Sequence, residues 1–293
     1  MIEYAPPKLV VVPPTVVVRT TNAPAPQLEP VNANFHIFDD ICTLNNVRAD
    51  YRPMKEAVIA RLDPRYQHQR SQISQYIELN LYGINLSTNF KQRLIKHINL
   101  IHSDYIAKLG IPAKREITLN IVVTPNRRHY DYYVSRYYEQ FKSSLGVHFG
   151  FMNIAFVDYQ GSDDKALKTA IHEAVHALNI HILGKTPRMF NEGIAQLYAH
   201  SNINKQGRLS VNVSSKDLER ESYPLMQFFD NEQWLYLEQS RLYASSWAWM
   251  RFMHSNAEGM YSLIHFMKNE LKRPCEVFSA DESYTLFQEK YNM

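Results

Sequence analysis

The stretch T-A-I-H-E-A-V-H-A-L-N at residues 169–179 decides how the rest of this sequence is interpreted. It contains no proline or glycine and places apolar residues around two histidines, which is typical of a partly buried helix. His172 and His176 are four residues apart, so a helix puts both imidazoles on one face, one turn from each other. Two histidines at this spacing can bind one metal ion, and zinc accepts such a pair among its tetrahedral ligands.

Glu173 stands directly after the first histidine and points beside the same ion. There its carboxylate can accept a proton from a water molecule that the ion activates. The alternative is that the two histidines are solvated on the surface of an amphipathic helix. The neighbours Ile171 and Val175 argue against it, because histidines among apolar side chains need a partner for their polar nitrogens.

A second segment, P-R-M-F-N-E-G-I-A-Q at 187–196, supplies a third ligand. A catalytic zinc site has three protein ligands and one open position. Thr186 can cap a helix here and Pro187 can occupy its first turn. The connection between the two helices is short enough for them to lie antiparallel, which brings Glu192 toward the histidines. Gly193 allows another backbone to approach closely.

These two segments, with R-L-Y-A-S-S-W-A-W-M-R-F-M at 241–253, resemble the gluzincin clan of zinc metallopeptidases. The sequence is most similar to the small bacterial domains that are grouped as peptidase-MA-like. The matching motifs span about residues 150 to 255, roughly a third of the chain, and they occur in the expected order.

The resemblance implies a function for each motif residue. The zinc ligands would be His172, His176 and Glu192, and Glu173 would be the general base. Tyr243 falls where the tyrosine-bearing members of the clan place the residue that hydrogen-bonds the tetrahedral intermediate. The alternative for this tyrosine is a packing role in the core.

Two departures from the clan's pattern refine these expectations. Aminopeptidase members carry a glutamate ahead of the motif helix, where this sequence has G-F-M-N at 150–153, so we expect internal cleavage. Strand 152–159 would then pair with an extended peptide through the residues Asn153, Ile154, Ala155 and Phe156. Gln196 stands where some gluzincins have an acidic residue that orients a histidine ligand, and it would be a weaker partner.

The remaining pattern predicts an α+β fold, a mostly helical zincin-like domain with a small sheet ahead of the histidine helix. Helical spacing of apolar residues extends over about 53–109, and β-branched runs at 117–125 and 152–159 predict two strands. Between them lies a tyrosine-rich helix that we expect to pack in the core.

We divide the chain into three parts. Residues 1–34 form a proline-rich arm or linker, 35–114 a helical N-terminal part, and 115–293 the zincin-like catalytic domain. The valines of the arm leave open that it packs along the body as an edge strand. Cys42 and Cys275 would be either buried free thiols or one disulfide.

Composition excludes several classes of partner. The formal net charge of +3 is small for 293 residues and its lysines and arginines are scattered, so we expect no nucleic-acid binding. No run reaches the roughly 18 to 20 apolar residues of a membrane span. The proline-rich start and the resemblance favour an exported bacterial protein, periplasmic or secreted.

The leading hypothesis is therefore a zinc-dependent peptidase that cleaves a peptide or protein substrate internally. The alternative is a metal-binding but inactive domain that recognises a peptide or cell-envelope partner. A third, weaker possibility is an assembly module without metal, which the complete ligand set argues against. The sequence predicts neither the side-chain specificity nor the oligomeric state, because both depend on contacts in three dimensions.

Overall fold

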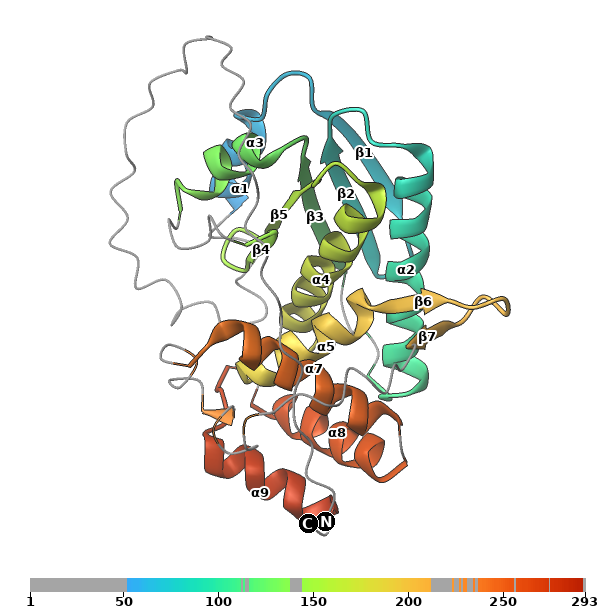
Figure 1. Cartoon of the computed structure of the whole chain (residues 1–293), viewed down its shortest axis with the longest axis vertical. Coiled ribbons are helices and arrows are strands. Elements are labelled where there is room, and N and C mark those ends of the chain that lie inside the picture. Colours follow the sequence, from blue (N-terminus) through green and yellow to red (C-terminus); the bar gives the residue numbers. More distant parts are fainter. Residues whose placement is uncertain are drawn as a thin grey trace.

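The computed structural model describes residues 52–111, 113, 116–137, 144–211, 223, 227, 229–230, 234, 237–255, 257–273 and 275–291. In this part of the chain the fold is α+β, with eight helices and two sheets (Figure 1), which confirms the predicted fold class. The arm at 1–34 and Cys42 lie outside the described residues.

The larger sheet has five strands in the order β1-β2-β3-β5-β4. They are β1 Gln67–Gln72, β2 Ile77–Gly83, β3 Ile117–Thr124, β4 Gly146–Phe149 and β5 Ile154–Asp158. The three central strands β2, β3 and β5 run parallel, whereas β1 and β4 are antiparallel to their neighbours and form the two edges. All five strands precede the histidine helix in the chain, as predicted.

Helices cover both faces of this sheet, and further helices extend the core (Figure 1). They are α1 Arg52–Ala60, α2 Thr88–Ala107, α3 Arg127–Val134, α4 Asp163–Ile182, α5 Arg188–Ala199, α7 Gln239–Ser255, α8 Ala257–Glu270 and α9 Ala280–Tyr291. Residues of α2 and α4 pack with one face of the sheet in a core that continues into α5, α7, α8 and α9. Residues of α1 and α3 pack with the other face.

The prediction of helical structure over about 53–109 is wrong for the segment that forms β1 and β2. In β2, Ile77, Leu79 and Leu81 alternate with more polar residues, and all three side chains are buried. This period of two places the three side chains on the sheet face that α2 covers. In a helix, residues at this spacing would not share one face. Because β2 pairs with β3, the sheet contains residues from both sides of the proposed boundary at 114/115.

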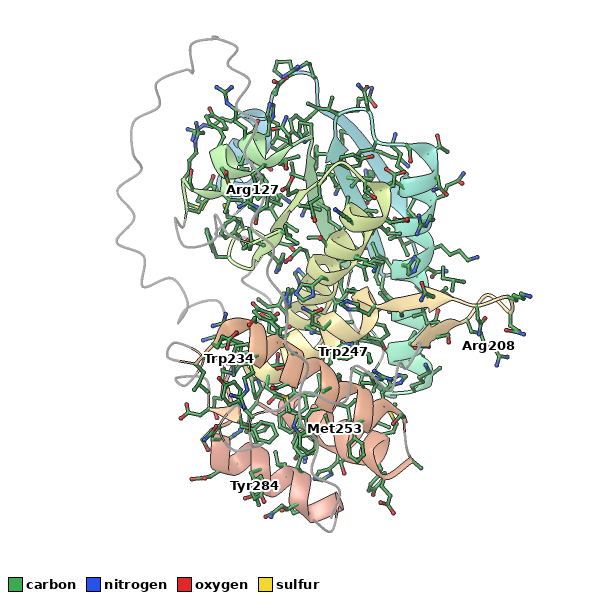
Figure 2. The ribbon with its side chains drawn as sticks, viewed as in Figure 1. Arg127, Arg208, Trp234, Trp247, Met253 and Tyr284 are labelled. Atoms are coloured by element: carbon green, nitrogen blue, oxygen red, sulfur yellow. The ribbon has the colours of Figure 1, made fainter. Side chains whose placement is uncertain are left out.

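Other predicted elements are confirmed with different ends. The strands predicted at 117–125 and 152–159 correspond to β3 and β5. The tyrosine-rich helix is α3, and its residues Tyr130 and Tyr133 are buried, as expected for core packing. A short hairpin of β6 Ser201–Ile203 and β7 Leu209–Val211 projects from the body, and Figure 2 shows Arg208 near its tip.

The start of α4 is held by polar contacts with α2 and β5. Ser162 is the N-cap residue, but its side chain makes no capping hydrogen bond. Asp163 instead accepts hydrogen bonds from the hydroxyls of Ser87 and Tyr159. Arg93 of α2 forms an ion pair of 2.6 Å with Asp164, and both acidic residues lie at the positive end of the α4 dipole.

An aromatic cluster fixes the other end of the molecule. The ring of Phe190 on α5 stacks on Phe266 of α8 at 3.9 Å and on Phe287 of α9 at 5.2 Å. These stacked rings tie α5 to the C-terminal helices and therefore restrict where the α5 side chains can point. None of the described helices combines the length and apolarity that crossing a membrane requires.

The side chain of Glu270, at the end of α8, ends in a buried carboxyl group. The residue is 0% exposed, and neither carboxyl oxygen has a hydrogen-bond partner in the part of the chain that the structure describes. Burial raises the pKa of Glu270 to about 9, against the opposing charge of Arg273. The folded state therefore keeps this proton across the pH range in which the unfolded chain has already released it.

We expect the free energy of unfolding to fall as pH rises from about 5 to 8, by up to about 1.4 kcal/mol per pH unit from this group. The Glu270→Gln variant keeps the neutral shape, so it should be more stable than the wild type at pH 8 and less dependent on pH. Urea denaturation at both pH values measures this. Glu258→Gln, an exposed change on the same helix, is the control and should retain the wild-type slope. Equal slopes for Glu270→Gln and the wild type would contradict the buried neutral carboxyl.

Candidate metal centre

The three predicted ligands meet where α4 packs against α5. Nε2 of His172 and Nε2 of His176 are 3.0 Å apart, and Oε2 of Glu192 lies 3.3 Å from the first and 3.4 Å from the second. Bonds of about 2.0–2.1 Å to a tetrahedral zinc ion would separate two ligand atoms by about 3.3 Å. Within the described ranges this is the one group of three such residues whose ligand atoms converge.

The donor set is chemically suited to a divalent cation. Its side chains are only 11–15% exposed, so the histidine nitrogens and the carboxylate are largely withdrawn from water. Burial alone would raise the pKa of Glu192, but the charge of His176 and hydrogen bonds with both rings hold it well below its usual range. Burial would lower the pKa of His176, yet the carboxylate of Glu192 raises it to about 9. A cation would replace the proton in this arrangement.

Glu173 lies on the same helix but faces the edge strand β4. It is 4% exposed, and burial raises the pKa of its carboxyl group although the two neighbouring histidines oppose this. The backbone of His148 in β4 hydrogen-bonds the carboxylate. Gly146, two residues earlier, leaves the space that Glu173 occupies, because a Cβ there would lie 2.6 Å from Oε1 of Glu173. The carboxylate is thus held between α4 and the edge of the sheet.

The expected substrate strand is wrong, because β5 is an interior strand. Ala155 and Phe156 pair with β3 on one side and with β4 on the other, and Ile154 pairs with Phe149. Asn153 precedes the strand, and its side chain donates to the carbonyl of Thr118. A peptide can be added only at an edge whose backbone groups are unpaired, and among the described strands β4 is the edge strand beside the candidate metal centre.

The strand β4 was missed because its four residues are too few to show an alternating pattern. His148 within it points toward α4, where burial and the rings of His176 and His181 lower its pKa to about 3. It is therefore a neutral histidine next to the candidate metal centre. Its closeness to these residues is a result of strand pairing and has no signal in the linear sequence.

Tyr243 lies on α7, and the structure brings it near the other site residues. Burial raises its pKa, and the charges of Glu192 and Glu173 add to this effect. Its ring packs edge-on against Trp234 at 5.8 Å, and Arg188 from the first turn of α5 hydrogen-bonds its hydroxyl. The packing of α7 against α5 depends on Gly193, since a Cβ there would lie 2.7 Å from the carbonyl oxygen of Ser246. This close approach of α5 and α7 is the one predicted for Gly193.

Gln196 lies one turn after Glu192, as predicted, but its side chain hydrogen-bonds neither histidine in the described structure. Its backbone carbonyl accepts from the backbone and the ring of His200. The polar neighbour of His176 is instead Asn191, which contributes to the raised pKa of that ring. Sequence reasoning overlooked this residue. The available signal was Asn179, a polar residue three positions after His176 on the buried side of α4, because a buried amide needs a polar partner and Asn191 is that partner.

Comparison of the sequence with models of known protein families and with curated proteins found no significant match to either. The function of the chain is therefore inferred from the chemistry and geometry of these residues.

We expect the Gly146→Ala change to reveal the contact between β4 and Glu173. The new methyl group would lie 2.5 Å from Thr169 and 2.6 Å from Glu173, so the free energy of unfolding should fall by about 1–3 kcal/mol. Gly150→Ala is the matched control, because its methyl group meets only the end of Ile180 at 3.0 Å. Chemical denaturation measures both.

A double-mutant cycle with Glu173→Ala assigns the effect to the carboxylate. If Glu173 fills the space beside Gly146, the cost of Gly146→Ala should be smaller by about 0.5 kcal/mol or more once the glutamate side chain is removed. Additive costs would show that the two residues do not compete for this space.

Proposed function

We propose that this protein is a zinc-dependent peptidase of the gluzincin type that cleaves peptide or protein substrates internally. The observation that carries the proposal is the convergence of His172, His176 and Glu192 at separations that match the edges of a zinc tetrahedron. Glu173 and Tyr243 then supply the two further groups that peptide hydrolysis needs, a base and a donor to the oxyanion.

Zinc bound there would polarise the scissile carbonyl and lower the pKa of the attacking water. Glu173 is the base that accepts the water proton. Burial raises the pKa of Glu173. A raised pKa suits a carboxylate that first accepts a proton from water and then delivers it to the leaving amine. The contact with the backbone of His148 orients the carboxylate, so it would be positioned before the substrate arrives.

The outer edge of β4, which no other described strand pairs with, would hold the substrate. The backbone of His148 faces Glu173 and therefore points away from β5. Because antiparallel pairing alternates the direction of backbone groups along a strand, the backbone groups of Gly146 also point away from β5. An extended peptide could pair with the backbone groups of Gly146 and the carbonyl of His148 as an additional strand. Leu145, which precedes the strand and is 50% exposed, would contact a substrate side chain.

Tyr243 would donate a hydrogen bond to the oxygen on which negative charge develops. Its raised pKa means that the hydroxyl keeps its proton at physiological pH and remains a donor. Trp234 and Arg188 hold the ring and hydroxyl in place, so little rearrangement would be needed during the reaction.

Metal content tests the first part of this proposal. We expect about one zinc ion per chain in protein purified without added metal, measured by elemental mass spectrometry, and its loss in His172→Ala. His200→Ala is the control, since the ring of this exposed histidine hydrogen-bonds the backbone carbonyl of Gln196. Zinc affinity should rise with pH up to about 9, because the proton on His176 competes with the ion below that value. No zinc in the wild type, even when zinc is supplied, would refute the proposed site.

Hydrolysis of a quenched fluorescent peptide library tests the second part. Glu173→Gln should lower turnover by roughly 10²–10⁴-fold while zinc stays bound, because the amide cannot accept a proton. Tyr243→Phe should lower it by roughly 10²–10³-fold, with Tyr261→Phe on the surface of α8 as control. Unchanged turnover in Glu173→Gln would refute its role. Binding of library peptides without turnover in the wild type would favour the metal-binding, inactive domain.

A further inference from the structure

Three hydrogen bonds converge on the two residues that precede the edge strand β4. Nη1 of Arg127 at the start of α3, labelled in Figure 2, donates to the carbonyl of Ser144 at 2.5 Å. The hydroxyl of Tyr130, one turn later on α3, hydrogen-bonds Oγ of Ser144 at 2.6 Å. The backbone amide of Asp158, at the end of β5, donates to the carbonyl of Leu145 at 2.9 Å. Neither Arg127 nor Tyr130 belongs to the proposed active site.

The guanidinium of Arg127 is itself held from several sides. Its Nε lies 2.9 Å from Oδ1 of Asp131, and Nη1 lies 3.8 Å from Oδ2 of Asp158. Its Cζ lies 4.6 Å from the centre of the Tyr130 ring, within the range of a cation–π interaction. These contacts restrict how the planar group can turn, so its bond to the carbonyl of Ser144 has a fixed direction. A hydrogen bond from such a charged donor is stronger than one between neutral groups.

The strand β4 depends on these contacts because it is short and lies at the edge of the sheet. It has four residues, and among the described strands it pairs only with β5. A short strand that is paired on one side has few backbone hydrogen bonds to fix its position. The side-chain contacts at Ser144 therefore help to determine where β4 begins.

The position of β4 is important because Gly146 lies directly against α4. A Cβ on Gly146 would lie 2.5 Å from Cγ2 of Thr169 and 2.6 Å from Oε1 of Glu173. Gly146 follows Ser144 by two residues, about 7 Å along an extended chain, so a displacement of Ser144 also moves Gly146. Because α3 packs on the sheet face opposite α4, its side chains hold β4 from one side while α4 bounds the strand on the other.

We propose that Arg127 and Tyr130 are positioning residues that clamp the start of β4 to α3 and thereby set the distance between this edge strand and Glu173. A substrate paired with β4 would then be placed relative to the metal centre by a helix that contributes no residue to that centre. This consequence for the substrate rests on the proposed function, whereas the clamp itself does not.

The test removes each contact separately. Arg127→Met removes the guanidinium and keeps most of the side-chain length, and Arg127→Lys keeps a charged donor. Arg128→Met, at the adjacent exposed position, is the matched control. Tyr130→Phe removes only a hydroxyl, and its control is Tyr133→Phe, which removes a hydroxyl of the same helix that accepts from the backbone of Asp63. Circular dichroism and thermal unfolding establish that each variant is folded.

Hydrogen exchange of single backbone amides, followed by ¹H–¹⁵N spectroscopy, measures the clamp. The Asp158 amide reports on the start of β4, because it donates to Leu145. The Ile121 amide in the central strand β3 reports on opening of the whole fold. Loss of the clamp should speed exchange at Asp158 by about 10-fold relative to Ile121, whereas a general loss of stability would speed both alike.

Peptide hydrolysis measures the consequence for the substrate. In Arg127→Met and Tyr130→Phe we expect kcat/KM to fall by about 10- to 100-fold with zinc content unchanged. The loss should be mainly a higher KM, because these variants displace the substrate strand and leave the metal ligands in place. Arg127→Lys should lie between Arg127→Met and the wild type, and both control variants should match the wild type. Should Arg127→Met not fold, the comparison of Tyr130→Phe with Tyr133→Phe decides.

Other outcomes separate the two proposals. Equal relative exchange at Asp158 in Arg127→Met, Tyr130→Phe and the wild type would overturn the clamp and leave the peptidase proposal standing. Faster exchange at Asp158 with unchanged kcat/KM would overturn the positioning role. A wild type without zinc or turnover would overturn the proposed function, and amide exchange alone would then decide whether the clamp exists.

Discussion

The pairing of one buried carboxylate with two imidazoles holds the centre of this molecule in a single arrangement. Glu192 is 8% exposed, and its oxygen lies within 3.4 Å of ring nitrogens from the neighbouring helix. An unpaired charge at such a position would cost several kcal/mol, so α4 and α5 must remain in register for the fold to be stable. The rest of the structure positions these two helices. The sheet supports α4 from one side, and the stacked rings of Phe190, Phe266 and Phe287 anchor α5 from the other.

Two glycines determine how closely other elements approach this pair. Gly146 lets the edge strand β4 lie against Glu173, and Gly193 lets α7 lie against α5 so that Tyr243 reaches the site. In both places a single methyl group would overlap atoms of the neighbouring element. The residues that would perform the chemistry therefore come close together because these two positions carry no side chain, as well as through their own contacts.

Burial has opposite consequences at different carboxyl groups. Glu192 is ionised because two histidines compensate for the loss of water. Glu173 has only partial compensation, and its pKa is raised. Glu270 has almost none and is neutral, with a pKa of about 9. The same physical cost thus gives an ionised carboxylate at the proposed metal site, a carboxyl group with a raised pKa at the position of the proposed base, and a source of pH-dependent stability, according to which charges lie nearby.

The sequence by itself determined the residues that have local signatures. The histidine spacing on α4, Glu192 beside Gly193 on the next helix, and the strands β3 and β5 all follow from periodicities within one element. The tertiary structure alone decided what depends on pairing between distant segments. It placed β5 inside the sheet and β4 at its edge, and it hydrogen-bonded Asn179 of α4 to Tyr105 of α2 and to Asn191 of α5. Which edge of a strand is free, and which polar group a buried side chain meets, depend on long-range neighbours that no local pattern records.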